Sequence, residues 1–435
     1  MPAERLHMRR PTRREFLKGL VIGGAAAAAP YVVPSRVLGL DGGAAPSDRI
    51  AMAIIGAGSR GTGVMGHFLR EADVQWIAVC DCRQERQKAG KAAVDKHYGN
   101  ADCAAYTDFL ELLARPDLDA LLIATKCHWH ALASIYAAKA GKDMYSEKPC
   151  TLTIGEGRAL VETMKRLGTV YQAGHQRRSV DSFRFMAEVV RKGMIGKVRT
   201  VICQNWAGGA HKPEAPQPVP PGFDYDRWLG WTPWHPYTPV RVRGSTEFWD
   251  TGGGILMDMG CHWTDMAQMV LGTDETGPVQ YEGEGVFDPA AFSDTPLTCE
   301  VRCTYAGGPT MVLRSSGKFE DRYIRFEGAE GWIQIMDGTN EVTAQPASIL
   351  KMRGISAKGW GDAGDHVRNF LDCVRTRGRT TCHPESAHRA TTIAHAANIC
   401  LRLGRKIRFD PRTERFDDAE ANRMMHRPLR APWHL

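Results

Sequence analysis

Apolar and polar positions divide the chain after residue 48 into two parts with different periodicities. In the first part, short apolar runs rich in β-branched and small residues alternate with amphipathic stretches. The apolar runs lie at residues 49–55, 74–79, 120–124, 143–145 and 170–172; helical stretches are expected at 62–71, 131–140 and 155–167, and a strand end, turn and helix at 105–113. Such runs indicate strands buried on both faces of a sheet. Their alternation with helices predicts βαβ units and a doubly wound parallel sheet, which is an α/β fold.

From residue 197 onward, apolar and polar residues alternate, which indicates strands with one exposed face. The alternating runs lie at residues 198–205, 298–305, 310–315, 323–327 and 332–336. They predict a second, open and mainly antiparallel sheet. Helical periodicity returns at residues 364–404. The tail, residues 417–435, contains Trp433 and several prolines, and it is expected to be an extended arm docked on the body or on a partner subunit.

A long segment between these strands, residues 208–239, is rich in Pro, Gly and Trp. Long loops with many rings are either packed Ω-loops or lids over a substrate. Aromatic faces suit the apolar faces of sugars, but ordinary loop packing explains the same residues. Both interpretations stay open at this point.

The length of 435 residues exceeds one average core and indicates two domains with extensions. Hydrophobic residues make up 43% and charged residues 24%, which is ordinary for a globular protein. The net charge of +7 is concentrated at the N-terminus, because residues 1–39 hold seven Lys and Arg against two Glu, leaving +2 for the rest. Nucleic acid binding therefore loses its main support.

The N-terminus has the pattern of a twin-arginine export signal. Residues 12–18 read Thr-Arg-Arg-Glu-Phe-Leu-Lys, and an Ala-rich apolar run follows at residues 20–34. That run is too short and too weakly apolar to span a bilayer comfortably, so no stable membrane anchor is expected. Cleavage is expected between Gly39 and Ala45, and the mature protein is expected in the periplasm or otherwise exported. The alternative is a basic, disordered tail.

Cysteine usage does not indicate a metal site. Twelve Cys are scattered without a CxxC pair or any metal-ligand spacing. Cys299 and Cys303 share a strand face but lie roughly 13 Å apart at ~3.3 Å per residue, too far for a disulfide. His128 and His130 are two residues apart and have no nearby acid or Cys ligand set. We expect no metal, and we expect the cysteines to be small buried hydrophobic residues.

A glycine-rich turn follows the first expected strand. Residues 56–61 read Gly-Ala-Gly-Ser-Arg-Gly, with a strand before them and a helix after them. In this context Gly56 permits the tight turn, Gly58 lets backbone approach a pyrophosphate, and Gly61 lets the helix lie close to the strand. The pattern predicts a dinucleotide-binding domain.

Asp81 lies at the end of the next strand, 20 residues beyond Gly61, where an acid accepts hydrogen bonds from the adenosine ribose. A carboxylate there repels a 2′-phosphate, which favours NAD over NADP. Arg83 keeps NADP open, because its guanidinium is able to pair with the extra phosphate. The alternative for Asp81 is a helix-capping acid that follows a strand.

Two further groups of residues carry candidate chemistry. Glu147, Lys148 and Pro149 follow a strand at the carboxyl edge of the parallel sheet, where ligands bind in such folds. Beside a cationic nicotinamide Lys148 is expected to have a lowered pKa and to move a proton to or from a substrate hydroxyl. Asp258 and His262 follow a Gly-Gly-Gly run at i, i+4, which would place them on one helical face. His262, titrating near neutrality, suits acid–base work.

Together these motifs resemble the Gfo/Idh/MocA family of oxidoreductases, which includes glucose–fructose oxidoreductase and inositol dehydrogenase. The resemblance spans roughly residues 48–410. It rests on the glycine turn, on Ala124 and Thr125 followed by His130, on the Glu-Lys-Pro triplet, and on the pair Asp258 and His262. Two positions depart from the family pattern: Lys126 stands where Pro is usual, and Cys127 where Asn or Asp is common.

The resemblance implies roles for individual residues. Lys148, Asp258 and His262 would be catalytic or substrate-binding residues. The expected cofactor-binding residues are Gly56, Gly58, Arg60, Gly61, Asp81, Arg83, Thr125, His130 and Glu147. Lys148 as a surface lysine and His262 as a buried core histidine are the alternatives. The expected organisation is a signal peptide and linker (1–45), an NAD-binding Rossmann domain (46–175), an α+β domain for substrate and oligomer contacts (176–410) and a C-terminal arm (411–435).

The implied function is hydride transfer between NAD and a hydroxyl-bearing carbon of a sugar or cyclitol. An exported enzyme would meet no evident soluble NAD pool, so the cofactor is expected to be loaded in the cytoplasm and to stay bound. The alternatives are a redox-neutral glycoside hydrolase, lyase or epimerase that oxidises a sugar transiently, and a binding protein that has lost turnover. The expected partners are a sugar or glycoside, the twin-arginine translocase and a second copy of this chain.

The export signal leads to a direct prediction. Replacing Arg13 and Arg14 together with Lys should leave full-length precursor in the cytoplasm, because the signal is defined by that pair. The measurement is an immunoblot of cytoplasmic and periplasmic fractions, with Arg9→Lys and Arg10→Lys as the matched control. Unchanged delivery of the Arg13/Arg14 variant to the periplasm would contradict the interpretation.

Overall fold

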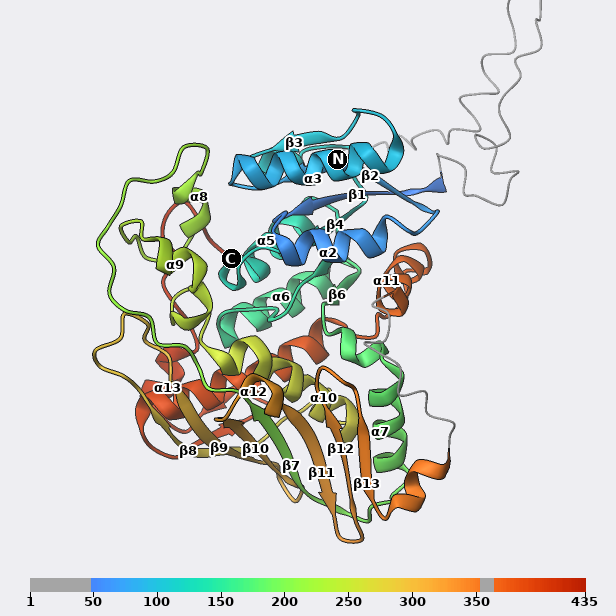
Figure 1. Cartoon of the computed structure of the whole chain (residues 1–435), viewed down its shortest axis with the longest axis vertical. Helices are drawn as coiled ribbons and strands as arrows, with labels where there is room; N and C mark the ends of the chain where they lie inside the picture. The colour runs from blue at the N-terminus through green and yellow to red at the C-terminus, as the bar shows by residue number, and fades with distance from the viewer. Residues whose placement is uncertain (1–47, 353–363) are drawn as a thin grey trace, which may run out of the picture. The chain divides into compact units, whose positions relative to one another are not determined.

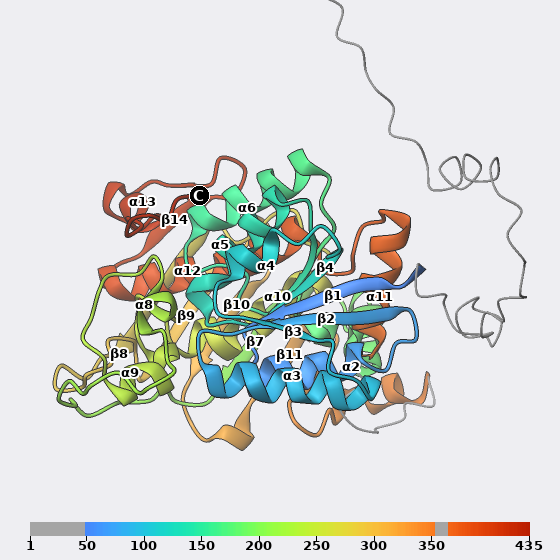
Figure 2. The ribbon, with the colours of Figure 1, turned by 90° about the horizontal axis from the view of Figure 1, so that it is seen from above.

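Residues 48–352 and 364–435 are described by a computed structural model of the chain. The export signal and its expected cleavage region lie outside the described residues. Residues from Arg49 onward form one unit by their contacts, and this unit contains both predicted sheets (Figures 1 and 2).

The first sheet is parallel, and in the described part of the chain it has six strands in the order β3-β2-β1-β4-β5-β6. The strands are β1 (Ile50–Ile55), β2 (Val74–Cys80), β3 (Ala104–Tyr106), β4 (Ala120–Ile123), β5 (Asp143–Ser146) and β6 (Tyr171–Ala173). The helices are α2 (Ser59–Phe68), α3 (Gln84–Tyr98), α4 (Phe109–Leu113), α5 (Cys127–Lys139) and α6 (Ile154–Leu167). The order reverses between β1 and β4, and ligands of doubly wound folds bind outside the strand ends at that point.

The strands of this sheet are buried on both faces, as their continuous apolar runs predict. Met52 and Ile54 of β1 pack on one side against α2 and α3, whereas Ala53 and Ile55 pack on the other side against α4, α5 and α6. The late helix α11 (Gly364–Thr376) completes the first side, where Phe370 meets the ring of Phe68 at 6.1 Å. The parallel sheet is therefore covered by residues from both ends of the chain.

The second sheet is mixed and mostly antiparallel, with nine strands among the described residues in the order β13-β12-β11-β7-β10-β9-β8-β14-β15. Its strands are β7 (Val198–Asn205), β8 (Gln280–Val286), β9 (Thr298–Thr304), β10 (Thr310–Ser315), β11 (Tyr323–Gly328), β12 (Trp332–Met336), β13 (Val342–Gln345), β14 (Ile407–Asp410) and β15 (Arg415–Phe416). The pair β7 and β10 is parallel, and the other pairs are antiparallel. Both predicted sheets are thus confirmed.

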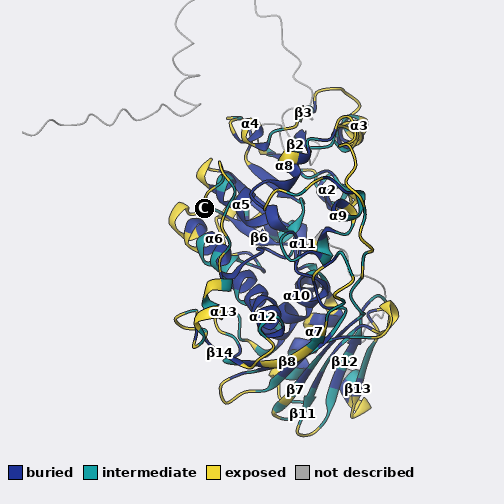
Figure 3. Ribbon diagram, turned by 90° about the vertical axis from the view of Figure 1, so that its left-hand side faces the viewer, coloured by how far each residue is buried: buried dark blue, intermediate teal, exposed yellow. Residues whose placement is uncertain are grey.

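One face of the second sheet packs on helices, and the other does not. The remaining helices are α7 (Asp181–Arg191), α8 (Tyr225–Leu229), α9 (Pro239–Arg243), α10 (Cys261–Leu271), α12 (Pro384–Leu403) and α13 (Ala419–Met424). Shorter helical turns lie at Gln176–Ser179, Ser245–Glu247, Leu256–Gly260, Phe319–Asp321 and Ala347–Met352. Inward residues of the strands form one core with Phe183 of α7, Trp263 of α10 and Ile393 of α12. Figure 3 shows α10 and α12 coloured as buried, above the strands of this sheet in that view.

Four strands of this sheet, β8, β13, β14 and β15, were absent from the sequence prediction. β8 contains Gly283 and Gly285, which weaken the apolar alternation that identifies a strand. The Cβ of any other residue at position 283 would lie 2.2 Å from the Glu300 carbonyl oxygen, so the close approach of β9 requires glycine there. β13, β14 and β15 have two to four residues each, too few to show a period.

All twelve cysteines lie in the described residues and are free thiols. Ten are buried, whereas Cys82 and Cys127 are half-buried, and burial raises the pKa of the Cys82 thiol to about 12. Within residues 48–352 and 364–435, no group of three or more His, Cys, Asp or Glu is placed to hold a metal ion. A search of the same residues finds no helix long and apolar enough to cross a membrane.

Candidate active site

The glycine turn between β1 and α2 lets three backbone segments meet. Gly56 has φ +95°, and a Cβ there would lie 2.6 Å from the Ala124 carbonyl oxygen. A Cβ on Gly61 would lie 2.2 Å from the Gly56 oxygen. Gly58 lines a cavity at this turn, and a Cβ on it would point toward Arg86 at 3.3 Å. Gly56 and Gly61 therefore permit the close approach of backbone, and Gly58 leaves the cavity open where a side chain would enter it.

The first turn of α2 borders this cavity and is suited to an anion. Gly58 is its N-cap residue, no side chain caps the helix, and the first turn contains no acidic residue. Uncapped N–H groups and the helix dipole favour a phosphate at such an end. This environment fits the diphosphate of a dinucleotide.

Asp81 lies at the end of β2 in the wall of the same cavity and is 6% exposed. Its two carboxylate oxygens accept the N–H groups of Ala57 and Arg83, each at 2.8 Å. Burial raises the pKa of Asp81, and these two N–H groups oppose that rise. The carboxylate thus holds the glycine turn through the Ala57 N–H, and it is still able to accept a hydrogen bond from a hydroxyl. The N-cap of α3 is Arg83 rather than Asp81, and no side chain caps that helix.

The two arginines near Asp81 take different positions. The guanidinium of Arg83 lies 4.3 Å from the centre of the Phe223 ring and donates to Glu85 at 3.3 Å, and Arg83 does not line the cavity. Arg86, one helical turn later on α3, does line it. The sequence analysis missed Arg86, although its spacing from Arg83 places it on the same side of the helix.

Among the residues after β4 and β5, some line the cavity and others lie behind its wall. Thr125 lines the cavity. His130 is buried behind it, where Nδ1 lies 2.7 Å from the Pro149 carbonyl and Nε2 lies 3.2 Å from the Thr125 carbonyl. Because burial lowers its pKa, His130 is neutral and carries one N–H, which the shorter contact assigns to Nδ1. This histidine holds together the two loops that carry the chemistry.

Glu147 is also buried behind the cavity. Its Oε1 accepts from Arg60 at 2.9 Å and from Gln176 at 2.8 Å. Burial alone would raise the pKa of Glu147, but Arg60 and Lys148 lower it below its ordinary value. Arg60, which lines the cavity, is therefore held in place by a carboxylate that remains charged.

Lys148 joins the parallel sheet to the second part of the protein. Its Nζ donates to Asp258 twice, to Oδ1 at 2.7 Å and to the backbone carbonyl at 2.8 Å. Burial lowers the pKa of Lys148, but the Asp258 carboxylate overcomes this effect and raises it above the ordinary value. The lowered pKa expected from the sequence applies to a lysine beside a cationic nicotinamide, and it stays a prediction. Lys148 also lowers the pKa of Asp258, so the two groups form a charged pair.

Asp258 and His262 lie in a distorted helix rather than on one regular helical face. Residues Leu256–Gly260 form a π-helical turn, which α10 continues. Gly253 and Gly254, with φ of +92° and +76°, make the sharp turn before it. The extra residue in a π-turn rotates the following side chains, and such turns occur often at functional sites. The expected i, i+4 alignment of the two side chains is therefore corrected.

His262 does not titrate near neutrality. It is 7% exposed, and burial, with Arg177 and Lys148 nearby, lowers its pKa well below the ordinary value. His262 is consequently a neutral imidazole, and its Nδ1 is buried without a hydrogen-bond partner. The unpartnered nitrogen is free to bind a hydroxyl, and the acid–base role expected of His262 stays a prediction.

Two residues near His262, His175 and Arg177, were missed by sequence reasoning. The ring of His175 meets that of His262 at 5.5 Å, and neither His175 nitrogen has a hydrogen-bond partner. Arg177 lies beside them, paired with Asp337 at 3.1 Å through Nε. The signal was the run His-Gln-Arg-Arg directly after β6, at the same carboxyl edge as Lys148. Lys126, noted as a departure from the family pattern, lines the cavity and has a pKa lowered by burial.

Comparison with known proteins gives two family matches. Residues 50–175 match "Oxidoreductase family, NAD-binding Rossmann fold", and residues 186–435 match "Oxidoreductase family, C-terminal alpha/beta domain". The chain belongs to the Gfo/Idh/MocA oxidoreductase family. It is therefore an oxidoreductase with an NAD-binding Rossmann domain, and the glycine turn, the first turn of α2 and Asp81 fit that cofactor.

Individual members of the Gfo/Idh/MocA family are similar over most of the chain. Myo-inositol 2-dehydrogenase of Thermotoga maritima is 27% identical, with 82% of this chain and 98% of that protein covered. The scyllo-inositol 2-dehydrogenase (NAD(+)) of Bacillus subtilis is 28% identical, with 63% and 72% covered. The structure of aldose-aldose oxidoreductase from Caulobacter crescentus superposes with a TM-score of 0.63 at 20% identity, covering 83% and 100%. The last likeness concerns the fold.

The position of Asp81 predicts how the protein discriminates between nucleotides. Asp81→Ala should weaken NAD binding by about ten- to hundredfold, the usual effect of losing hydrogen bonds to a charged group. NADP binding should fall less, because the same change removes a repulsive charge. The measurement is titration calorimetry of both nucleotides with Asp81→Ala and Asp81→Asn, and with Glu85→Ala as an exposed acid control. Equal losses for both nucleotides in the two Asp81 variants would refute a role at the ribose.

The Lys148–Asp258 pair predicts a pH effect. Asp258→Asn should lower the pKa of Lys148, because burial then acts without the opposing carboxylate. Acylation of Lys148 by an amine-specific reagent should therefore become faster and begin at lower pH in the variant. Mass spectrometry of the labelled peptide between pH 7 and 10 measures this, and exposed Lys192 is the internal reference. An unchanged pH profile for Lys148 would show that Asp258 does not control its protonation.

Proposed function

We propose that this oxidoreductase transfers a hydride between retained NAD and a hydroxyl-bearing carbon of a sugar or cyclitol. The observation that carries the proposal is the charged pair of Lys148 and Asp258. Ala124, Thr125 and Lys126, which follow β4, line the cavity. The carboxyl ends of β4 and β5 are adjacent, so Lys148 lies at the same edge of the sheet.

The side chains in and around this pair have different roles toward a substrate. Lys148, held protonated by Asp258, donates a hydrogen bond or a proton to a substrate oxygen. Neutral His262 offers its unpartnered Nδ1, and Asp258, whose side chain is 42% exposed, keeps an acceptor oxygen available. Bound NAD would supply the site that accepts or returns the hydride. In the oxidation direction, Lys148 must first lose its proton so that it is able to take up the proton of the hydroxyl held near it.

A polyhydroxylated substrate fits this set of polar groups. Cationic Lys148 and Lys126, the Asp258 carboxylate and neutral His262 provide donors and acceptors within one small region. Relatives named as inositol dehydrogenases support the same substrate class. NAD is proposed over NADP because the Asp81 carboxylate stands in the cavity wall, although Arg86 also faces the cavity.

Location and assembly complete the proposal. Arg13 and Arg14 would direct the folded protein to the twin-arginine translocase and into the periplasm. An enzyme there would work with the nucleotide that it carried across the membrane. The open face of the nine-stranded sheet would serve contacts with a second copy of this chain, giving a homo-oligomer.

The test is turnover by the purified holoenzyme. Sugars and cyclitols are screened by nicotinamide absorbance at 340 nm together with product identification. Lys148→Ala should lower kcat by a factor on the order of 10² to 10⁴, as expected for losing a general acid–base group. NADH binding should stay nearly unchanged. Lys148→Arg should also be slow, because arginine keeps the ion pair but does not release a proton in this range.

The control is Lys192→Ala, which removes an exposed lysine paired with Glu188 on α7. Near-normal turnover of Lys148→Ala would remove Lys148 from the chemistry. If the parent enzyme changed no sugar or cyclitol while binding NAD, the proposed substrate class would be wrong.

A further inference from the structure

The outer end of the NAD cavity is closed by two segments that lie outside the Rossmann fold. One is the α8 loop, residues 222–231. The other is residues 427–435, the part of the tail that follows α13, and from here on only this part is called the C-terminal arm. Arg227, Trp228 and Trp433 from these segments line the cavity together with Asp81 and Arg86. Figure 1 shows the C-terminus beside α8 and α5.

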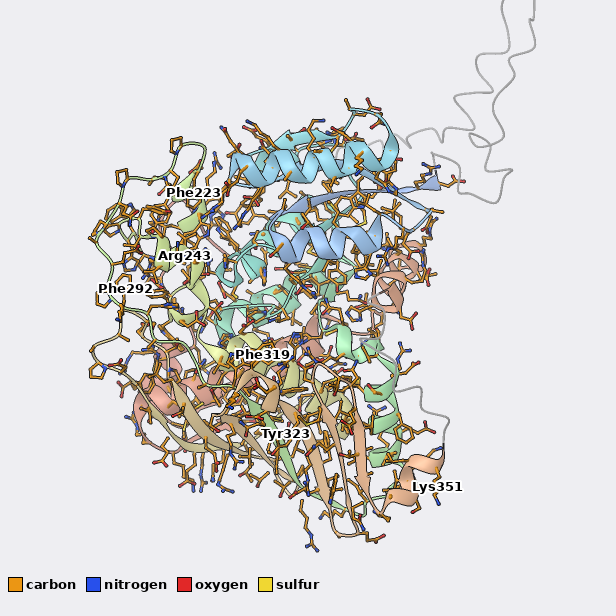
Figure 4. All side chains as sticks on the ribbon, in the orientation of Figure 1. Phe223, Arg243, Phe292, Phe319, Tyr323 and Lys351 are labelled. Carbon is orange, nitrogen blue, oxygen red and sulfur yellow. The ribbon has the colours of Figure 1, made fainter. Side chains whose placement is uncertain are left out.

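The α8 loop is fixed to the ends of Rossmann elements. The Gln84 N–H donates to the Gly222 carbonyl at 2.8 Å, and the Asp224 N–H donates to the Cys82 carbonyl at 2.9 Å. Phe223, labelled in Figure 4, lies under the Arg83 guanidinium. Arg227 pairs with Asp108 at 2.7 Å, just before α4. The loop therefore spans the outer end of the cavity from β2 to α4.

The C-terminal arm is fixed to this loop and to the Rossmann helices. Arg430 donates to the Gly230 carbonyl at 2.6 Å and to Asp226 at 2.6 Å, and its own N–H donates to the Trp231 carbonyl at 2.8 Å. Trp433 then stacks on Phe109 with a ring separation of 5.9 Å and meets Trp129 edge-on at 4.8 Å. The arm thus ends in an aromatic cluster on α4 and α5.

The chemistry of this end of the cavity matches an adenosine. The rings of Phe109, Trp129, Trp228 and Trp433 supply aromatic surface for a purine. The Asp81 carboxylate supplies an acceptor for ribose hydroxyls. The anion-binding turn of α2 and Thr125 line the same cavity. The lining therefore holds aromatic surface for the adenine, an acceptor for the ribose and an anion site for the diphosphate.

We propose that the C-terminal arm retains the cofactor, with Trp433 forming part of the adenine-binding wall. Release of the dinucleotide then requires the arm to separate from the α8 loop, which slows dissociation. This inference rests on the proposed function, which includes a retained NAD. It assigns the retention of NAD to the C-terminal arm. Trp433 is a binding residue for adenine and takes no part in the chemistry at the nicotinamide.

The experiment measures nucleotide release from the full-length holoenzyme. NADH dissociation is followed by fluorescence after mixing with excess NAD, and affinities for ADP-ribose and nicotinamide mononucleotide are measured by calorimetry. Trp433→Ala should accelerate NADH release and weaken ADP-ribose by roughly ten- to hundredfold, the range for one stacking contact with a base. Affinity for nicotinamide mononucleotide should not change. Trp433→Phe should retain most of the parent behaviour, because it keeps an aromatic face.

Arg430→Ala is the second variant, because it weakens the attachment of the arm without removing a side chain that lines the cavity, and it should also accelerate release. The control is Trp234→Ala, which removes a tryptophan that is 63% exposed and does not line the cavity. Parent-like release from Trp433→Ala, or an equal loss of ADP-ribose and nicotinamide mononucleotide, would overturn the proposal. These measurements do not depend on turnover, so a failure to oxidise any sugar would refute the proposed function and leave the retention result standing.

Discussion

The ion pair between Lys148 and Asp258 is the interaction on which the site depends. Lys148 follows β5 at the carboxyl edge of the parallel sheet, and Asp258 lies in the π-helical turn before α10. Each charge would be costly in this partly buried position without the other. The pair therefore fixes the geometry between the two halves of the site and also the protonation state of the lysine. It further contributes to keeping His262 neutral, since a second positive charge beside Lys148 is unfavourable.

In the proposed reaction, the same pair also determines which proton transfer Lys148 is ready to make before substrate binds. A protonated lysine is prepared to give a proton to a carbonyl oxygen, whereas oxidation of a hydroxyl needs Lys148 to lose its proton first. A cationic nicotinamide near Lys148 would lower its pKa, and a reduced, neutral one would not. In the proposed reaction, the charge of the cofactor and the charge of the lysine would therefore be coupled, and Asp258 would determine how strongly. The sequence alone did not show the part of Asp258, because it depends on the distance between residues 110 positions apart.

The sequence predicted both sheets, because buried parallel strands and half-exposed strands leave different periodicities. It also predicted the glycine turn, because Gly56 and Gly61 occupy positions where a Cβ would collide with backbone. It missed β8, whose glycines replace the expected apolar residues, and it placed Asp258 and His262 on a regular helix. A π-turn depends on the packing of its neighbours, including the Asn398 side chain that donates to the Gly253 carbonyl at 2.8 Å. Shifts in the pKa of Lys148 and His262 likewise arise from burial and partners that no local pattern records.

The aromatic residues of the loop and the tail show how much of a segment's role can be predicted from its amino-acid composition. The content of Trp and Pro in the loop left a substrate lid and ordinary packing equally open, and the structure shows that the loop is packed. Phe223, Tyr225 and Trp228 pack with Tyr237 in a small cluster of their own, so the loop is stable without a ligand. Trp228 also faces the cavity, and the Gly230 carbonyl receives Arg430 of the arm. Trp433 belongs to the arm and lines the cavity, so the proposed separation of the arm would open one part of the wall while the α8 loop stays in place. A site that keeps its cofactor through many turnovers and is loaded once, as proposed, would need this division between a fixed wall and a separable segment.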